Sequence, residues 1–459
     1  MNQTPQTQER DQLLSELHQL IAGREREGIL GLARRMGPTE WAELIPQLDR
    51  DEVATLVDWL PDEQIADLLA ELEPEQAADI LRTLAHGEAA DVLEEMPPDD
   101  AADVVAELAE HEAAPILIQM RPDEAAELRD LLAYPADTAG GMMTPAYVAV
   151  RADARASDVV TALRRASESA ETFSYIYVVD DERRLVGVLS LRSLVLTGPG
   201  TAVRELMAPE TIRVRADVDR EAAARLVTDY NFLALPVVDA QDRLLGIITQ
   251  DDVADVLEQE ATEDIERLGG QQPLETSYRL ASVPLLFRRR IGWLLLLFVA
   301  GAYTGTVMRA FEQELQSVIA LSLFIPLLIG TGGNIGSQTV TLVVRAMGIG
   351  EVRLRDLGWV LWKELRVGLA MGAVLALVAF GRAELPIIGL AVGTDVALIV
   401  AISIFAIALW AITVAAVLPL LLRRLGVDPA VVSAPLITTL VDGTGLIIYF
   451  EIARLVLRA

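Results

Sequence analysis

PLLIGTGGNIGSQT, residues 326–339, sets glycines and polar side chains inside an apolar segment of the chain. Gly330, Gly332 and Gly333 permit a backbone that is not helical, and such a backbone is tolerated at membrane depth only where it lines a cavity or is buried in protein. Close packing of helices on small residues would explain the glycines alone. The polar side chains that accompany them are Asn334, Ser337, Gln338 and Thr339. The stretch therefore predicts a broken membrane helix that lines a pore.

This stretch belongs to the second of five apolar runs, each long enough to cross a hydrocarbon core, which takes about 20 helical residues. The runs cover residues 291–308, 318–344, 359–380, 396–422 and 431–457. Five such runs in succession argue against buried helices of a large soluble protein. Lys and Arg concentrate in the loops of one side, which predicts an N-terminus inside the cell and a C-terminus outside. We expect a multi-pass protein of the inner (plasma) membrane, in contact with lipid.

The fifth run carries Asp442 near its middle. A carboxylate at that depth costs roughly 3 kcal/mol on insertion scales, so we expect it to face water, a cation or a partner rather than lipid. Pro435 precedes it and frees backbone carbonyls, and Thr438 and Thr439 add hydroxyl groups nearby. Glu451 lies nearer the outer end, where it either forms an outer cation ring or reaches the interface.

These donors are all oxygen atoms, which suits a hard divalent cation. Magnesium loses its waters reluctantly, so a wide site that holds the hydrated ion by one carboxylate per chain and by backbone oxygens would fit it. Manganese, cobalt and calcium fit the same donors. The membrane part therefore predicts a path for divalent cations without choosing among them.

Charge separates the membrane part from the rest of the chain. Residues 276–459 carry 15 Lys and Arg against 10 Asp and Glu, and residues 1–275 carry the remaining 23 and 57, so the net charges are +5 and −34. An acidic surface attracts cations and argues against nucleic acid as a partner. There is no cysteine, which excludes disulfides and thiolate metal sites. The three histidines stand far apart in the sequence, which is not the pattern of a zinc site.

A short repeat occupies residues 41–132, visible in PDEQIADLLAEL, PEQAADILRTL, GEAADVLEEM and PDDAADVVAEL. Its aspartates recur at steps of 12 residues, at Asp67, Asp79, Asp91 and Asp103. A Pro or Gly start followed by an acidic first turn is typical of short helices. Units this small cannot bury a core alone, so the repeat predicts a stacked helical solenoid. Each aspartate alone is best explained as a solvated position or a cap, but a row of them would hold hydrated cations.

A longer unit repeats between Gly140 and Leu257. The matching pairs are Met143-Thr144-Pro145 with Met207-Ala208-Pro209, YIYVVD (175–180) with LPVVD (235–239), and GVLSLRSL (187–194) with GIITQDDV (246–253). Each copy predicts a helix, a short strand, a turn, a short strand and a helix.

These two copies resemble a pair of cystathionine beta-synthase (CBS) modules, which are regulatory and often bind adenosine nucleotides. In that family the hydroxyl and the acid of a G-h-h-T-x-x-D stretch hold the ribose. Thr249 and Asp252 match this pattern, whereas the first copy has Ser190 and Ser193 and lacks the acid. The resemblance implies at most one site for ATP or another adenosine nucleotide. A purely structural role for these strands is the alternative.

The acidic repeats, the paired CBS modules, the acidic helix after them and the motifs GTGGNIGSQT and DPAVVSAPLITTLVDGTG together resemble the MgtE family of magnesium channels over nearly the whole chain. The resemblance implies a multidomain membrane protein with an α-helical solenoid-like domain, an α/β CBS pair and an all-α membrane domain of five transmembrane helices. The expected divisions are residues 1–135, 136–257, 258–287 (an acidic linking, plug-like helix and connector) and 288–459. It also implies a homodimer, a pore on the two-fold axis and no enzymatic activity.

The resemblance assigns roles to individual residues of this chain. In the pore they are Gly330, Asn334, Thr438 and Asp442, with Asp442 as the selectivity acid. The acids expected to bind regulatory magnesium are Asp252, Asp255, Glu260, Glu263, Asp264 and Asp428. Two positions depart from the family pattern. Ala434 replaces a frequent Asn, which leaves only a backbone carbonyl there, and Asn231 replaces a frequent Asp.

The linking helix connects the acidic modules to the first span, so its acids are expected to lie near those modules. This arrangement predicts a gate that responds to divalent cations. Without a divalent cation the like charges repel, and bound cytosolic magnesium would favour the compact, closed state. We therefore expect magnesium uptake that is limited by magnesium inside the cell.

Other functions fit parts of this pattern. A proton- or sodium-coupled carrier, including one for manganese or cobalt, would also have broken helices and an acid at mid-membrane. An intramembrane aspartyl protease would pair Asp442 from two chains, but it leaves the acidic part unexplained. A receptor or scaffold without permeation leaves the polar stretch of the second span unexplained.

Overall fold

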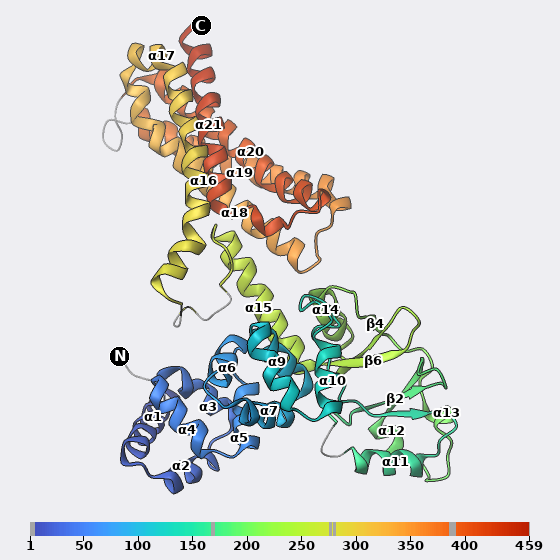
Figure 1. Ribbon diagram of the computed structural model, residues 1–459. Helices are drawn as coiled ribbons and strands as arrows, with labels where there is room; N and C mark the ends of the chain where they lie inside the picture. The colour runs from blue at the N-terminus through green and yellow to red at the C-terminus, as the bar shows by residue number, and fades with distance from the viewer. Residues whose placement is uncertain (1–4, 167–169, 275–277, 279–280, 385–391, 459) are drawn as a thin grey trace. The chain divides into compact units, whose positions relative to one another are not determined.

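The computed structural model describes residues 5–166, 170–274, 278, 281–384 and 392–458 (Figure 1). The chain divides into two compact units, Met1–Glu260 (unit 1) and Ala261–Ala459 (unit 2). Unit 1 holds short helices and small sheets, and unit 2 holds long helices.

Unit 1 begins with a stack of short helices. They are α1 (Pro5–Gly23), α2 (Arg26–Ala33), α3 (Pro38–Leu44), η1 (Ile45–Gln47), α4 (Arg50–Trp59), α5 (Asp62–Ala70), α6 (Pro74–Leu81), α7 (His86–Glu95), α8 (Pro98–Ala106), α9 (Glu110–Gln119) and α10 (Pro122–Leu131). From α5 onward each helix packs on the helix after next, so that α5, α7 and α9 form one row and α6, α8 and α10 form another. The predicted helical solenoid is confirmed.

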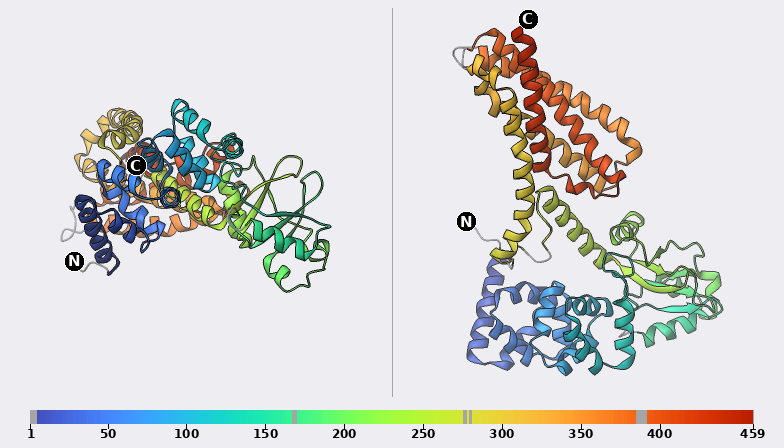
Figure 2. Two further views of the ribbon diagram at one scale, coloured as in Figure 1. Left: turned by 60° about the horizontal axis from the view of Figure 1, so that its bottom comes forward. Right: turned by 45° about the horizontal axis from the view of Figure 1, so that its top comes forward.

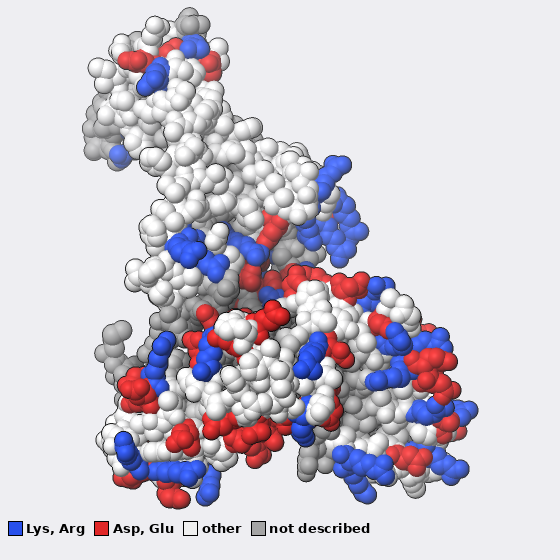
Figure 3. All heavy atoms as spheres, viewed as in Figure 1, with Lys and Arg blue, Asp and Glu red and all other residues white. Residues whose placement is uncertain are grey.

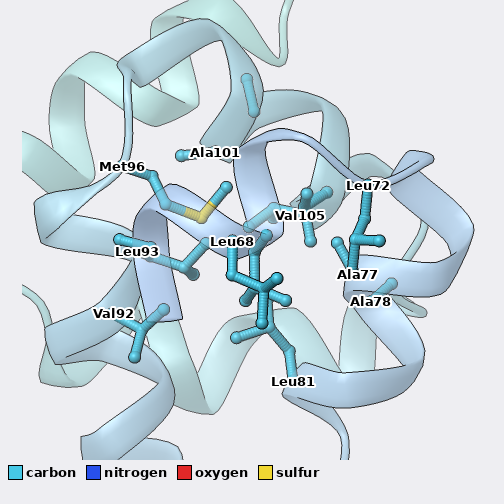
Figure 4. Packing of buried hydrophobic residues seen from close by; sticks show 14 of the residues in the cluster. Leu68, Leu72, Ala77, Ala78, Leu81, Val92, Leu93, Met96, Ala101 and Val105 are labelled. Atoms are coloured by element: carbon cyan, nitrogen blue, oxygen red, sulfur yellow. The ribbon is translucent and has the colours of Figure 1, made fainter. Parts of the chain in front are cut away.

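Local signals start these helices and apolar side chains hold them together. Glu88 and Glu112 accept hydrogen bonds from the backbone N–H groups of Ala85 and Ala109 at 3.1 and 2.9 Å, which satisfies donors that helix starts leave free. Figure 4 shows Leu68, Leu81, Leu93 and Val105, from four successive helices, pointing into one shared core. Because no repeat buries this core alone, the stack is stable only as a unit.

Two three-stranded sheets follow, one for each copy of the longer repeat. Their elements are β1 (Ala149–Arg151), α11 (Ala156–Arg165), β2 (Tyr175–Val179), β3 (Leu185–Ser190), α12 (Leu191–Val195), α13 (Val203–Leu206), β4 (Val214–Arg215), α14 (Arg220–Tyr230), β5 (Ala234–Val238), β6 (Leu244–Thr249) and α15 (Gln250–Leu268). In both sheets the middle strand pairs in parallel with the first and antiparallel with the last, and the register shifts at the same place. The predicted order is confirmed, with one short strand added at the start of each copy.

The regular elements among the described residues of unit 2 are all helices. Its elements are α16 (Val283–Ala310), α17 (Glu312–Ser317), η2 (Ile319–Phe324), α18 (Ile325–Gly348), η3 (Leu354–Asp356), α19 (Leu357–Glu384), α20 (Thr394–Arg424), η4 (Pro429–Val431) and α21 (Ala434–Arg458), after the end of α15. Four stretches are long and apolar enough to cross a membrane: Val283–Ala310, Ile319–Gly348, Leu354–Glu384 and Thr394–Arg424.

These four stretches match the first four predicted spans. The fifth, α21, has 25 residues, carries Asp442 and Glu451, and is not among the four found in the described part of the chain. Its crossing stays a prediction. On the face drawn in Figure 3, the charged side chains of unit 2 gather toward the ends of its helices and leave their middles uncharged, as expected for helices in hydrocarbon.

The predicted break in the second span is wrong. α18 continues without interruption from Ile325 to Gly348, through every glycine of the motif. The irregular backbone comes earlier, in η2, and Pro326 follows it in the first helical turn, where proline is tolerated. Glycine permits a non-helical backbone but does not require one, and tertiary packing decides at this place.

Candidate ion path and sensor sites

Three glycines of α18, Gly332, Gly333 and Gly336, lie in the contact with α21. A Cβ atom added at Gly332 would lie 2.8 Å from Val441, and one added at Gly336 would lie 2.6 Å from Ile437, closer than real Cβ contacts. Gly333 approaches Thr438 in the same way, at 2.8 Å. The two helices are antiparallel, because Gly332 meets the later residue of α21 and Gly336 the earlier one. The packing explanation therefore holds for these three glycines.

Gly330 differs from the other glycines of the motif, because an added Cβ would meet nothing within 4 Å. Asn334, Gln338 and Thr341 follow it at helical spacing, and all four residues are exposed. α18 thus turns Gly332, Gly333 and Gly336 toward α21, and turns a polar stripe away from the core. Polar groups on a membrane helix are expected to face water or another protein surface rather than lipid. Sequence reasoning named all of this stripe except Thr341, which the i, i+4, i+7 spacing would have found.

Asp442 lies on α21 one turn after Thr438. Its Oδ1 atom is buried and has no hydrogen-bond partner among the residues that the structure describes. Thr438 Oγ1 is 3.2 Å from Ser337 Oγ of α18 and donates to the carbonyl of Ala434 at 3.0 Å. The structure therefore joins the two predicted pore helices through Thr438 and leaves the acid with a free oxygen.

Two contacts next to Asp442 were not predicted from the sequence. The ring of Tyr303 on α16 lies against Gly443, where there is no room for a Cβ atom. Trp410 Nε1 on α20 donates to Thr444 Oγ1 at 2.7 Å. Together with α18, whose Gly332 lies against Val441, the helices α16 and α20 thus contact α21 within one turn of Asp442. Such pairs lie far apart in the sequence, and only the fold brings them together.

Glu451 is not a free outer acid. Arg454 donates from Nη1 to Glu451 at 3.1 Å and from Nε and Nη2 to Glu314 at 2.9 and 2.8 Å. The guanidinium also lies 4.9 Å from the centre of the Phe311 ring. These contacts favour a structural role at the helix end over the outer cation ring.

In unit 1, acids of the helical stack meet acids of α15. We call this set the acidic seam, which consists of Glu73, Asp99, Asp100, Asp103, Asp252 and Asp255. Burial, followed by the charge of Asp252, raises the pKa of Asp99 to about 7. Burial and the charge of Asp99 raise the pKa of Asp100 to about 8. Burial and the charge of Asp252 also raise the pKa of Asp103, the most exposed of the three acids of α8, to about 6.

The seam continues to Asp255 on α15 and to Glu73, which precedes α6. Burial and Asp255 raise the pKa of Glu73, and burial and Glu258 raise that of Asp255. The Oδ1 atom of Asp99 is buried without a partner in the described part of the chain. Within that part, no three acids or histidines converge as a preformed metal site. The seam is thus a place where negative charges crowd together and a mobile cation would relieve them.

Three of the other predicted sensor acids are paired with arginines. In unit 1, Glu260 accepts from Arg220 Nε at 2.9 Å. In unit 2, Arg267 donates from Nη2 to Glu263 at 2.7 Å and from Nη1 to Asp428. Asp264 lies beside Gly348 at the end of α18. The expectation that the linking helix carries mutually repelling acids overlooked Arg220 and Arg267, which neutralise much of that charge.

The predicted nucleotide residues do come together. Thr249 donates from Oγ1 and from its backbone N–H to Asp252 Oδ2, the latter at 3.3 Å, and Thr249 itself is buried. In the first copy, the hydroxyl groups of Ser190 and Ser193 lie 2.8 Å apart without an acid. Asp252 therefore belongs to both the nucleotide motif and the acidic seam. Asn231 ends α14 in the left-handed conformation with φ 53°, which Asn tolerates better than most residues.

Comparison with family models covers most of the chain. Residues 325–452 match the model MgtE, described as a divalent cation transporter, and residues 36–137 match the MgtE intracellular N domain. Residues 139–197 and 203–259 each match a CBS domain.

Several known proteins are similar to this chain. The magnesium transporter MgtE of Thermus thermophilus is 46% identical over 340 residues, which are 72% of this chain and 73% of that protein. The magnesium transporter MgtE of Bacillus subtilis is 36% identical over 330 residues, 70% of each chain. Among solved structures, the soluble part of a magnesium transporter aligns with a TM-score of 0.52 at 32% identity, covering 55% of this chain and 99% of that one. The cytosolic domain of the Mg²⁺ channel MgtE in complex with ATP aligns with a TM-score of 0.51 at 39% identity, covering 53% and 99%.

Proposed function

This chain belongs to the MgtE family of divalent cation transporters, and we propose that it is a magnesium channel that mediates uptake and is closed by magnesium in the cytosol. It is a multi-pass membrane protein and not an enzyme. The relatives that are named magnesium transporters support magnesium as the transported ion. The family assignment replaces the intramembrane protease hypothesis.

The observation that carries this proposal is the buried Oδ1 atom of Asp442, which has no hydrogen-bond partner among the described residues. Asp442 lies on α21, which packs against α18. A carboxylate in that position is stable only if a cation or water reaches it. We propose that Asp442 is the selectivity acid and that Thr438 helps to position it. A hydrated magnesium ion, held through its waters, would suit one carboxylate per chain.

A homodimer would complete the pore. The polar stripe of α18, which includes Gly330 and Asn334, is exposed in the single chain. A second copy across a two-fold axis would bring two such stripes and two Asp442 side chains around one water-filled path. The apolar outer faces of the bundle would then contact lipid.

Regulatory magnesium would bind in the acidic seam. The raised pKa values of Asp99 and Asp100 and the unpartnered atom of Asp99 fit a divalent cation, because bound cations relieve crowded, buried carboxylates. We propose Asp252 and Asp255 as ligands from α15. Glu260, Glu263, Asp264 and Asp428 would contribute weaker sites. ATP or another adenosine nucleotide would bind at Thr249 and Asp252, as the ATP complex of the structural neighbour supports.

The proposed layout has an N-terminus in the cytosol and a C-terminus outside. α16 and α21 are parallel, because Trp293 meets Ser433 and Tyr303 meets Gly443. Parallel first and fifth spans support an odd number of crossings. We propose four domains, residues 1–135, 136–257, 258–287 and 288–459. Reporter fusions after Arg382 and at the C-terminus should both read external, and a cytosolic reading at the C-terminus would contradict the layout.

The test of function is magnesium flux into proteoliposomes that contain the full chain, measured with a magnesium-sensitive dye. Asp442→Ala should abolish or sharply reduce the flux, and Asp442→Asn should keep the pore shape but lose the preference for divalent over monovalent cations. Asp395→Asn, at an exposed carboxylate at the start of α20, is the matched control and should behave as the unmodified protein. Wild-type flux in either Asp442 variant would remove this acid from the pore, and flux coupled to protons or sodium would favour the carrier.

A further inference from the structure

The connector that follows α15, residues 269–274, is held against the first turns of α16 by backbone and side-chain contacts within unit 2. The backbone N–H of Gln272 donates to the carbonyl of Arg289 at 3.1 Å, and Arg290 Nε donates to Gln271 Oε1 at 3.1 Å. Gly270 lies between the end of α15 and these two glutamines, and it has a φ of 76°. Glycine adopts this conformation without strain. The linking helix and the first span thus meet at a defined joint.

Trp293 lies at the centre of this joint. A Cβ atom added at Gly270 would lie 2.8 Å from Cδ1 and Nε1 of the Trp293 ring and 3.3 Å from Pro435. The same Nε1 donates to Ser433 Oγ at 3.1 Å. Ser433 is fully buried and accepts a hydrogen bond from the backbone of Leu436, so it caps the start of α21. One indole ring therefore contacts Gly270, two residues after the end of α15, and Ser433, at the start of the helix that carries Asp442.

A second aromatic contact lies further along the same two helices. Tyr303 is ten residues after Trp293, and Gly443 is ten residues after Ser433. Ten helical residues span about 15 Å, so α16 follows α21 in register between the two contacts. The right view of Figure 2, like Figure 1, shows α16 (yellow) and α21 (red) side by side. A displacement of α16 at Trp293 would therefore reach Gly443, the residue next to Asp442.

We propose that Trp293 is the positioning residue that couples the end of the linking helix to the pore helix. It does not bind the ion. It converts a movement of the Gly270 segment into a movement of Ser433 and, through α16 and Tyr303, of the backbone beside Asp442. This inference rests on the proposed function, because it explains how sensing in the cytosol would reach the pore.

The test separates sensing from pore closure in the full chain. Trp293→Phe keeps a ring but removes the N–H donor, Trp293→Leu removes both, and Gly270→Ala pushes on the ring from the other side. Trp362→Leu, at an exposed position of α19, is the matched control. Two quantities are followed as internal magnesium is varied: magnesium flux into proteoliposomes, and protease cleavage of α15. We expect the Trp293→Leu and Gly270→Ala variants to conduct magnesium and to keep magnesium-dependent protection of α15. Their pores should close only at an internal magnesium concentration about tenfold or more higher than in the unmodified protein. A shift of that size is typical of the coupling between two sites.

Each outcome decides the matter. Flux that still closes over the unmodified magnesium range in both variants would overturn the coupling role. Joint loss of protection and closure, including in the milder Trp293→Phe variant, would also overturn it, because Trp293 would then serve sensing or folding. Absence of magnesium flux in the unmodified protein and in Trp362→Leu would overturn the proposed function itself, which is a different result from a failure of coupling.

Discussion

Replacing Arg267 by Gln removes the only positive group seen between Glu263 and Asp428 in the described part of unit 2. Arg267 donates to both carboxylates, and through Asp428 it ties the end of α15 to the loop before α21. Under the proposed function this contact belongs to the closed state. Gln is shorter than Arg, keeps one amide donor group and removes the charge.

The magnitude follows from exposure. The three side chains are 33%, 29% and 36% exposed, so solvent screens the pairs and each is worth about 0.2–1 kcal/mol. Two such pairs amount to roughly 0.4–2 kcal/mol. A change of that size alters a two-state ratio by about 2- to 30-fold. In the absence of magnesium the closed contact of Arg267→Gln should be populated less by this factor.

The assay is magnesium flux into proteoliposomes with the internal magnesium chelated or saturating, together with protease cleavage around residues 255–274. With chelator, Arg267→Gln should show higher flux and faster cleavage than the unmodified protein. At saturating magnesium the two proteins should converge, because the ion can then bridge Glu263 and Asp428 without competition from the guanidinium. Arg355→Gln, at an exposed arginine 3.9 Å from Asp356, is the control and should change nothing.

Equal resting flux and equal cleavage in Arg267→Gln and the unmodified protein would refute this reasoning. The pair of contacts would then be a surface ion pair without influence on the gate. Increased cleavage without increased flux would show that the contact holds α15 but does not control the pore.

Two further predictions concern the seam and the helix contact. Raised pKa values mean that folded Asp99 and Asp100 keep protons that the unfolded chain has lost, so without magnesium the stability of the full chain in detergent should fall as the pH rises from about 4 to 8. Thermal unfolding should show this slope and Asp99→Asn should flatten it; a slope unchanged in the variant would contradict the assignment. Gly336→Leu should cost about 1–3 kcal/mol by overpacking against α21, measured as loss of folded protein on heating, whereas Gly358→Ala, which meets nothing within 4 Å, should be neutral.

The sequence was sufficient for features that depend on local patterns. The 12-residue repeat predicted the helical stack because each unit carries its own start signal and apolar face, and the paired motifs predicted both sheets. It failed at Gly332 and Gly333, where glycine allows two backbones and the contact with α21 favours the helix. Arg267 stands four residues after Glu263, a spacing that predicts an ion pair on a helix. Its bond to Asp428 spans 161 residues and depends on the fold.

The contrast between the acids that are paired with arginines and the acids of the seam indicates where magnesium sensing resides. Magnesium at Glu260 or Glu263 would have to displace a guanidinium that is already bound, whereas at Asp99 and Asp252 it would relieve buried charge that has no such partner. An ion shifts a gate only by its preference for one state, and a nearly complete switch needs roughly 5.5 kcal/mol. The seam should supply most of it. Combined Asp99→Asn and Asp252→Asn should therefore weaken magnesium-dependent closure more than Glu260→Gln and Glu263→Gln together, measured as flux against internal magnesium. The reverse order would place the sensor on the arginine-paired acids, where magnesium would act by breaking ion pairs instead of relieving repulsion.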